Sequence, residues 1–543
     1  MKLDEATTPQ SRTLTVAAVL VASLAMGGWL IERGTHSGPS TPAEAARLFD
    51  DVFVHVYRNY VDSVGAGMLY RKAVDGMLYE LGDPYTALLA PDKFGRLTET
   101  TSGNYAGVGI QTDLRDGWLV VIAPVAGSPA ERAGIEPGDR IIEIDGRSAH
   151  GWTLEEATAA FRGKPGTSIS IRVERPGFSL PIPYRLIRKP LHQSAVRRIA
   201  MLPNGIGYID IKAFSDSTTR ELTRSVNELI RRGVHSIVLD LRGNPGGLLE
   251  QGLNVSDMFL GRGQKIVSLR GRTSNANRDY LDSTAQRWPA LPLVVLVDDK
   301  SASASEIVAG ALQDHDRAVL VGEPTYGKGS AQTIIPLGPI GGLKITTSRW
   351  YTPSGRSIAR RAQRDDDEDA QNPPSRERYL TDSKRVVYGG GGISPDILAS
   401  DSAISEETRK LQAALGRKVA VFRDALTDYA LSLKAKRDTK TDFVVTPAML
   451  EELWNRMVAR GIDMPRSIYD ESSRVVSHLM TYEIARYVFG PEMEFRRRVA
   501  NDRAIAIALE LATGVRSQRE LIEKAAAKQK KQVADASVDS DGE

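Results

Sequence analysis

One stretch of this chain, residues 291–332, restricts the fold more than any other, because a strand, a turn, a helix and a glycine-flanked lysine follow one another. LPLVVLVD has the length and branched composition of a buried strand, and SEIVAGALQD carries apolar residues at helical spacing. The serine-rich turn between them can project a hydroxyl into a cleft. The first free N–H groups of the helix would then point at developing oxyanion charge. This order of elements predicts a nucleophilic serine at a helix N-terminus.

A serine hydroxyl needs a base that takes its proton, and Lys328 is a better candidate than a histidine. The histidine nearest to the serines, His315, stands at the far end of the predicted helix in a polar run typical of solvated residues. Lys328 lies between Gly327 and Gly329, which allow close approach of the backbone. Burial would lower the lysine pKa from about 10.4 and leave a neutral amine that can act as general base. The residues alone do not rank the serines of the turn, which are Ser301, Ser303 and Ser305.

The two blocks SASASEIVAGALQD and RAVLVGEPTYGKGSAQT closely resemble the active site of the carboxyl-terminal processing peptidases, also called tail-specific proteases. The resemblance implies that Ser303 is the nucleophile, that Lys328 is the base and that Gln332 orients the lysine. Ser301 and Ser305 are then interpreted as turn and helix-cap serines. This choice among the serines depends on the resemblance.

A second block, HSIVLDLRGNPGGLLEQGLNVSDMFL, predicts a buried strand, a glycine-rich turn and an amphipathic helix. Its glycines allow backbone N–H groups to approach a ligand oxygen, as an oxyanion hole requires, although a tight strand-to-helix connection explains them equally well. The family resemblance extends to LRGNPGG. It implies that the amide of Gly246 or Gly247 joins the amide of Ala304 in the oxyanion hole, and it does not decide between the two glycines.

Two other enzyme classes have related motifs, and both are disfavoured. The segment Gly322–Lys328 fits the first seven positions of the phosphate-binding pattern G-x-x-x-x-G-K-[ST], but Gly329 replaces the hydroxyl residue and a strand-like segment follows where a helix is needed. The S-x-x-K pattern of penicillin-binding proteins is absent from the chain.

From residue 103 to about residue 175 the chain shows several short strands and two short helices with glycine punctuation. This order, with the phrase AGIEPGDRIIEIDG, resembles a PDZ domain, in which an extended peptide adds a strand to a sheet edge and glycine-loop amides hold its terminal carboxylate. The resemblance implies that a helix beginning near Thr153 forms the other groove wall. It also implies that Arg162 couples ligand binding to catalysis. The residues expected to bind a substrate C-terminus are Gly107, Val108, Gly109, Ile110, Leu154 and Arg162.

Length and composition exclude several classes. The 543 residues allow three or four domains, and the net charge of +3 gives no electrostatic signature of nucleic-acid binding. The chain has no cysteine, which excludes disulfides, thiol catalysis and thiolate metal sites. With only 7 histidines, no metal constellation stands out, and we expect neither a metal nor a cofactor.

The N-terminus carries a run of 19 residues without a charge, from Thr13 to Ile31, which is long enough to cross a bilayer as a helix. Lys2 and Arg12 precede it, and no small-residue cleavage site is evident after it. This pattern favours an uncleaved signal anchor over a cleaved signal. It predicts a single-pass protein of the bacterial inner membrane with its catalytic body in the periplasm or at the cell exterior.

Pattern and resemblance together predict an α/β protein with a crotonase-like (ClpP-like) catalytic core, an inserted PDZ domain and added helices at both ends. A charged, proline-containing insertion over residues 359–380 is expected to be exposed or disordered. The expected divisions are a stub and signal anchor (1–37), N-terminal helices (38–101), the PDZ domain (102–178), the peptidase core (185–400), a C-terminal helical domain (401–523) and a disordered tail (524–543).

The predicted function is that of a serine endopeptidase that recognises the C-terminus of unfolded proteins and cleaves near it through a Ser-Lys acyl-enzyme mechanism. The expected partners are protein or peptide substrates with a free C-terminus, the inner membrane, a second copy in a homodimer and an adaptor protein, but no nucleic acid. The alternative is a catalytically silent PDZ scaffold that only binds protein tails. Intact serine, lysine and glutamine argue against it.

Overall fold

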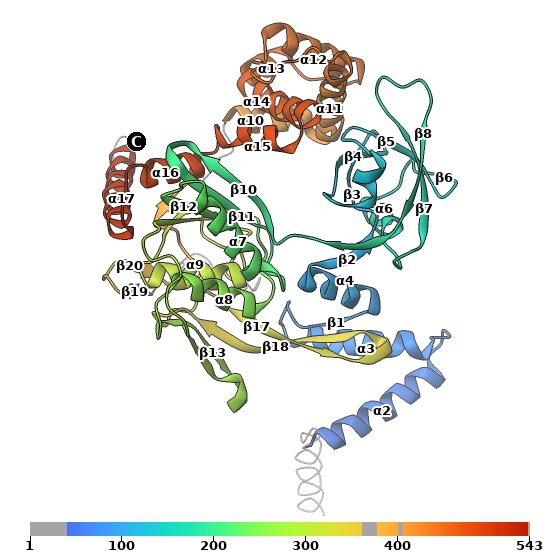
Figure 1. Cartoon of the computed structure of the whole chain (residues 1–543). Coiled ribbons are helices and arrows are strands. Elements are labelled where there is room, and N and C mark those ends of the chain that lie inside the picture. Colours follow the sequence, from blue (N-terminus) through green and yellow to red (C-terminus); the bar gives the residue numbers. More distant parts are fainter. Residues whose placement is uncertain (1–40, 361–376, 400–405, 541–543) are drawn as a thin grey trace, which may run out of the picture. The chain divides into compact units, whose positions relative to one another are not determined.

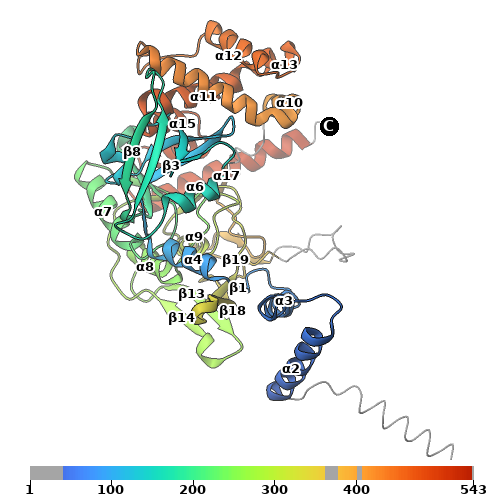
Figure 2. The ribbon, with the colours of Figure 1, turned by 90° about the vertical axis from the view of Figure 1, so that its right-hand side faces the viewer.

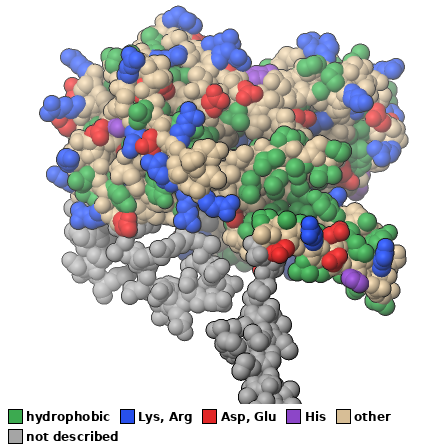
Figure 3. Space-filling view, turned by 90° about the horizontal axis from the view of Figure 1, so that it is seen from below, with side chains coloured by type: hydrophobic (Ala, Val, Ile, Leu, Met, Phe, Trp, Pro, Cys, Tyr) green, Lys and Arg blue, Asp and Glu red, His purple; other side chains and the backbone are tan. Residues whose placement is uncertain are grey.

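The structure is a computed structural model that describes residues 41–360, 377–399 and 406–540. The chain divides into two compact units, residues 1–88 and 89–543. In the first unit, a capping box between Thr41 and Glu44 starts helix α2 (Pro42–Asn59), and α3 (Ala66–Tyr79) follows. Helix α2 buries none of its residues, and apolar side chains such as Phe49 and Val52 are exposed on it. Figure 3 shows hydrophobic side chains at the surface in a view from below.

The segment predicted to be a PDZ domain forms an antiparallel sheet in the order β3-β4-β5-β7-β8, with β6 paired to β5 (Figure 1). In β7, buried and exposed residues alternate strictly, as expected for a strand with one face on a core. Its elements are β3 (Ile110–Arg115), β4 (Trp118–Pro124), α5 (Pro129–Ala133), β5 (Arg140–Ile144), β6 (Arg147–Ser148), α6 (Leu154–Phe161), β7 (Ser168–Glu174) and β8 (Ile182–Ile187). Strand β3 is one of the two edges of this sheet.

Short elements flank this sheet along the chain. They are β1 (Ala87–Leu89), α4 (Pro91–Ser102), β2 (Asn104–Gly107) and β9 (Lys189–His192). Strands β2 and β9 pair with each other in an antiparallel ladder. The chain thus enters and leaves the predicted PDZ segment through two neighbouring strands.

The next segment forms a six-stranded sheet in the order β10-β11-β12-β15-β16-β21. All neighbouring strands are parallel except β10 and β11. The strands are β10 (Val196–Leu202), β11 (Ile206–Ile211), β12 (Ser236–Asp240), β15 (Leu293–Val297), β16 (Val319–Gly322) and β21 (Ile397–Leu398). Strands β11, β12 and β15 are buried throughout, which agrees with their continuous apolar runs.

Helices cover both faces of this sheet (Figures 1 and 2). Apolar residues of α7 (Thr218–Arg231), α8 (Leu249–Phe259) and α9 (Ala304–Asp314) share one core with one face of the sheet. Residues of α16 (Arg503–Ala512) and α17 (Gln518–Ser540) share a second core with the other face. The turns after β12 and β15 lie at the carboxyl ends of neighbouring parallel strands, where ligand sites of such sheets form.

A second, antiparallel sheet contains β17 (Ser330–Pro336), the strand that follows Lys328. Strand β17 pairs with β18 (Gly342–Tyr351), which pairs with β13 (Lys265–Gly271), and β13 pairs with β14 (Arg278–Leu281). Strands β19 (Arg378–Leu380) and β20 (Val386–Tyr388) form a hairpin. Residues 361–376, which include most of the predicted insertion, lie outside the described part of the chain.

The helices beyond residue 405 have two different partners. Those that form a core of their own are α10 (Glu406–Leu415), α11 (Val419–Lys436), α12 (Pro447–Ala459), α13 (Arg466–Glu471) and α14 (Ser473–Ile484), and α15 (Pro491–Val499) follows. Val120 and Ile122 of β4 join this core, whereas α16 and α17 cover the parallel sheet. The tail predicted to be disordered is helical through Ser540. Leu521 and Ala525, four residues apart, are buried against the sheet core and stabilise α17 there.

The predicted membrane localisation is corrected. Within residues 41–360, 377–399 and 406–540, no helix is both long enough and apolar enough to cross a bilayer. The anchor expected at Thr13–Ile31 lies outside the described residues. We therefore assign neither a membrane span nor a periplasmic location to this chain.

Candidate active site

Ser303 occupies the turn between β15 and α9, as the N-cap of the helix. Its backbone has φ 57° and ψ −115°, a conformation that non-glycine residues rarely adopt. Such strain costs on the order of 1–3 kcal/mol and persists where the surrounding structure enforces it, often at active sites. The half-buried side chain of Ser303 therefore stands on a strained strand-to-helix turn.

The structure separates the three serines that the residues alone could not rank. The hydroxyl of Ser301 donates to the carbonyl oxygen of Leu241 at 2.9 Å, and that of Ser305 donates to the carbonyl oxygen of Asn244 at 3.0 Å. Both side chains are fully buried. Ser305 was interpreted as a cap residue, but it lies inside α9, and Ser303 holds the cap position. Ser301 and Ser305 thus anchor the turn to the neighbouring loop.

Glu306, which the sequence analysis did not single out, connects the serine turn to the lysine loop. Its Oε2 accepts the backbone N–H groups of Ser303 at 2.8 Å and of Lys328 at 3.0 Å. Its Oε1 accepts the N–H of Gly327 at 2.7 Å and the hydroxyl of Thr325 at 2.6 Å. Burial raises the pKa of Glu306, and these donated hydrogen bonds oppose that rise. The spacing S-x-x-E of a capping box was the sequence signal that could have identified this residue.

Lys328 is half-buried in the loop before β17. Its carbonyl oxygen accepts the indole N–H of Trp350 at 3.0 Å. Two residues into β17, the side-chain amide of Gln332 donates to Ser330 at 2.9 Å and to Thr346 at 3.1 Å. A strand and not a helix follows the lysine, so the geometry of a phosphate-binding loop is absent from this described segment.

The glycine-rich turn after β12 lies directly against the serine turn. A Cβ atom on Gly246 would stand 2.7 Å from the Cβ of Ser303 and 2.7 Å from the carbonyl oxygen of Ala302, so only glycine fits. The N–H of Gly246 donates to the side chain of Asn244 at 2.9 Å. Since that amide is engaged, Gly247 is the better candidate for the donor that accompanies Ala304.

His315 is remote from the serine turn, because it caps the opposite end of the 11-residue helix α9. The prediction that it is solvated was wrong: its side chain is only 9% exposed. Its ring nitrogens contact the carboxylate of Asp382 at 2.8 Å and the carbonyl oxygen of Lys265 at 2.7 Å. Tertiary contacts of β13 and the loop after β19 bury it.

The predicted carboxylate loop of the PDZ segment, residues 107–110, joins β2 to the edge strand β3. The N–H of Val108 donates to the carbonyl oxygen of Phe161 at 3.2 Å, so this amide is used inside the protein. Gly109 has φ 76°, and a Cβ there would lie 2.3 Å from the Cβ of Ser128. Leu154, on α6, is 39% exposed beside the open edge that β3 presents.

Arg162 ends α6 and pairs with Glu99 of α4. Its guanidinium also lies over the ring of Tyr105, 5.2 Å from the ring centroid. The structure thus connects Arg162 to the segment that precedes the PDZ sheet.

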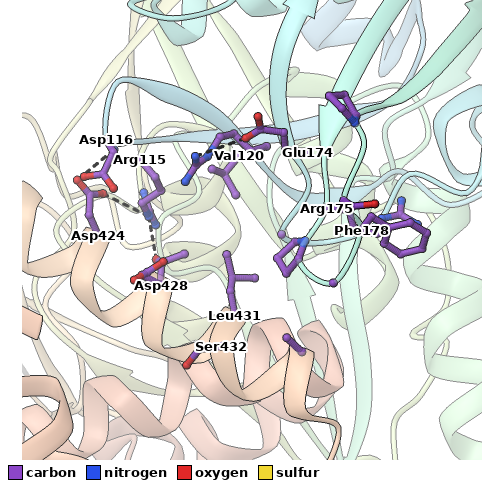
Figure 4. A pocket seen from close by; sticks show the side chains of 18 of the residues that line it. Arg115, Asp116, Val120, Glu174, Arg175, Phe178, Asp424, Asp428, Leu431 and Ser432 are labelled. Atoms are coloured by element: carbon purple, nitrogen blue, oxygen red, sulfur yellow. Dashed lines mark hydrogen bonds and ion pairs between the residues drawn. The ribbon is translucent and has the colours of Figure 1, made fainter.

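A separate cavity of about 440 Å³ lies between the PDZ segment and α11 (Figure 4). Arg115 is almost fully buried there, and its Nε donates to Thr427 at 3.0 Å. Ion pairs join it to Asp113 at 2.7 Å and to Asp424 at 4.0 Å. Neither Ser303 nor Lys328 is among the described residues that line this cavity.

Comparisons with known proteins identify the class to which this fold and site belong. The model of peptidase family S41 matches residues 205–367, and a PDZ-domain model matches residues 120–175. The carboxy-terminal-processing protease of Bartonella bacilliformis is 38% identical over 328 residues, which are 60% of this chain and 74% of that protein. The carboxy-terminal processing protease CtpA of Bacillus subtilis is 31% identical over 409 residues, 75% of this chain and 84% of the relative.

Among solved structures, the photosystem II D1 C-terminal processing protease is 28% identical. The similarity covers 69% of this chain and 97% of that chain, with a TM-score of 0.35. At this TM-score the overlay adds nothing to the sequence evidence. On the sequence evidence, the chain belongs to the carboxy-terminal processing proteases, the serine-type peptidases of family S41 that here carry a PDZ domain.

Proposed function

We propose that this chain is an endopeptidase that cleaves protein substrates near their C-terminus with Ser303 as nucleophile and Lys328 as general base. The observation that carries the proposal is the position of Glu306 Oε2, which accepts the backbone N–H groups of both residues. Two loops that are remote in the sequence are thereby held side by side. The strained φ of Ser303 and the engaged hydroxyls of Ser301 and Ser305 support the choice of nucleophile.

The proposed reaction has two acyl-transfer steps. The Oγ of Ser303 attacks the peptide carbonyl carbon while the neutral amine of Lys328 takes the hydroxyl proton. The backbone N–H groups of Ala304 and Gly247 stabilise the oxyanion, and the lysine returns the proton to the departing amine. Water then attacks the acyl-enzyme, with Lys328 again as base. We assign Gln332 to the alignment of the amine, because its strand continues directly from the lysine loop.

We propose that the PDZ domain selects substrates by their free C-terminus. Strand β3 is an edge strand, and α6 lies beside it, which is the arrangement that receives an extended peptide by strand addition. Because the N–H of Val108 is engaged by Phe161, the amides of Gly109 and Ile110 are the loop donors that we assign to the terminal carboxylate. Arg162 is proposed to couple occupancy of this groove to α4 through Glu99.

The proposal has two further parts, which concern the fold of the catalytic core and the oligomeric state. We propose that the parallel sheet with α7, α8 and α9 on one face is a crotonase-like core. We also propose that two copies associate through the unit containing α2 and α3, because α2 leaves its apolar residues exposed. Light scattering of the full chain would return the monomer mass if this association were absent.

A fluorophosphonate probe that reacts with activated serines tests the catalytic proposal directly. We expect wild-type protein to be labelled and to cleave an unfolded test protein, and Ser303→Ala to lose both properties while remaining folded. Lys328→Ala should lose cleavage to a similar extent, since residues that act as one unit give losses that do not add. Ser305→Ala is the matched serine control and should keep a reactive Ser303. An unlabelled wild-type protein that still binds protein tails would establish the silent scaffold instead.

A further inference from the structure

Arg242 lies in the loop that carries the proposed oxyanion-hole glycine, and its guanidinium connects this loop to neighbouring carboxylates. The Nε and Nη2 of this arginine contact the carboxylate of Asp240 at 3.0 and 2.6 Å. Its Nη1 lies 2.9 Å from Oδ2 of Asp502, a residue 260 positions further along the chain. Burial opposes the charge of Arg242, but the carboxylates of Asp240 and Asp502 outweigh it and raise its pKa. A permanently charged arginine therefore connects the loop to the C-terminal helices.

The connection continues from Arg242 to the serine turn through short polar contacts. The N–H of Gly243 donates to Asp298 at 2.9 Å, and its carbonyl oxygen accepts Lys212 Nζ at 3.0 Å. One residue further, the carbonyl oxygen of Asn244 accepts the N–H of Ala302 at 3.0 Å. A shift of Arg242 would therefore reach Ala302, the residue that precedes Ser303.

Asp502 is fixed independently of the loop. It is the N-cap of α16, and its Oδ1 accepts the N–H of Ile505 at 2.9 Å. Ala504, Ile505 and Ala508 of the same helix are buried in the core on the sheet. The carboxylate thus projects from a rigid helix end toward the loop.

The space behind the loop is open rather than packed. A cavity of about 710 Å³ lies there, lined among others by Lys212, Arg242, Gly243 and Asp502. On this side the described contacts of Arg242 and Gly243 are polar, and their partners include Lys212, Asp298 and Asp502. The contact from Asp502 comes from α16, and not from the parallel sheet or its connecting loops.

We propose that Asp502 is a positioning residue for catalysis, which acts through Arg242 to hold the loop so that the Gly247 amide faces the developing oxyanion. This inference rests on the proposed function of Ser303 and extends it to a helix at the other end of the chain. The N-cap of α16 then contributes to catalysis, whereas the rest of the helix covers the sheet.

The test compares variants that treat the helix cap and the ion pair differently. Asp502→Ser keeps a good N-cap, because serine caps helices about as well as aspartate, but is too short to reach Arg242. Asp502→Asn keeps the cap and one acceptor oxygen for the arginine. Glu510→Gln is the matched control, because it removes a carboxylate charge from the same helix. The partner of that carboxylate is Lys528 of α17 and not a residue of the loop.

We expect kcat of Asp502→Ser to fall by about 10-fold or more with KM changed less than about 2-fold, since misplacing a donor weakens transition-state stabilisation more than binding. The rate of fluorophosphonate labelling should fall in parallel, with an unchanged thermal midpoint. Asp502→Asn should be intermediate, and Glu510→Gln should match wild type.

An unchanged kcat in Asp502→Ser would overturn the inference. So would losses of kcat and thermal midpoint together in both Asp502 variants, because these would report only a structural role. Ser303→Ala in the same assay reports on the proposed function itself. If that variant kept full activity, the proposed function would be wrong and this inference would fall with it.

Discussion

The backbone N–H groups of Ser303 and Lys328 both donate to the same atom, Oε2 of Glu306, at 2.8 and 3.0 Å. The residues lie on different loops, one before α9 and one before β17. A carboxylate that is fully buried between them makes the separation of the two loops a fixed property of the fold. The proposed nucleophile and base are thereby held next to each other without requiring contact between their side chains.

Replacing Glu306 by glutamine should reduce both stability and catalysis. Each carboxylate oxygen accepts two donors, and a glutamine can offer an oxygen to only one of these pairs. A buried donor left without a partner costs about 1–3 kcal/mol. We expect a lower free energy of unfolding in urea and a lower kcat. Glu250→Gln, an exposed residue on neighbouring α8, should change neither; equal effects of the two substitutions would contradict the assigned role.

Amidating the C-terminus of a model substrate should slow its cleavage at subsaturating concentration, because the charge that the PDZ loop would hold is removed. Leu154→Asp on the groove wall should raise KM in the same way, with Ser303 still reactive toward the probe. Leu180→Asp, which changes an exposed leucine elsewhere in this domain, is the control. Gly109→Asp is unsuitable, since its side chain would collide with Ser128. Equal cleavage of amidated and free-acid substrates would exclude recognition of the terminus.

Arg115→Met should destabilise the association between the PDZ domain and α11. The substitution removes the cation that pairs with the buried carboxylate of Asp424, and the loss of one partner of a buried ion pair typically costs about 3–5 kcal/mol. We expect the first unfolding transition of the variant to occur at a lower urea concentration than that of wild type. Arg140→Met removes an exposed arginine whose pair with Glu174 is 3.6 Å long, and should cost less than about 1 kcal/mol. Similar shifts for the two variants would show that burial of Arg115 does not matter.

Glu221 should stabilise the fold in a pH-dependent way. Burial would raise its pKa, but hydrogen bonds from Ser194, His192, Ser217 and the N–H of Val196 lower it to about 2. Because the folded pKa is depressed from 4.5, the stabilisation is present above about pH 4.5 and is lost as the pH falls toward 2. Glu221→Gln should therefore lower the free energy of unfolding by about 2 kcal/mol at pH 7 and by less at pH 3. A difference independent of pH would contradict this account.

Local patterns predicted the elements that carry the candidate site. The apolar run before Ser303 became β15, the spaced apolar residues after it became α9, and the glycine-rich LRGNPGG block became the turn between β12 and α8. The order of strands also predicted the PDZ domain, whose model matches residues 120–175. These features depend on neighbours within a few residues, so the periodicity of side chains is enough to reveal them.

Contacts between distant segments could not be predicted in this way. The burial of His315 and the packing of the helical tail on the sheet each depend on a partner elsewhere in the fold. For this reason the sequence predicted a solvated histidine and a disordered tail.

The sequence by itself determined the class of chemistry and the turns that present it, because a strand, a turn and a helix are specified by local spacing and composition. Only the tertiary structure brought Glu306 between the serine and the lysine and placed Asp502 against Arg242. The physical reason is that the position of a buried charge is set by the packing of whole helices and sheets around it. No spacing along the chain encodes a contact between residues 242 and 502.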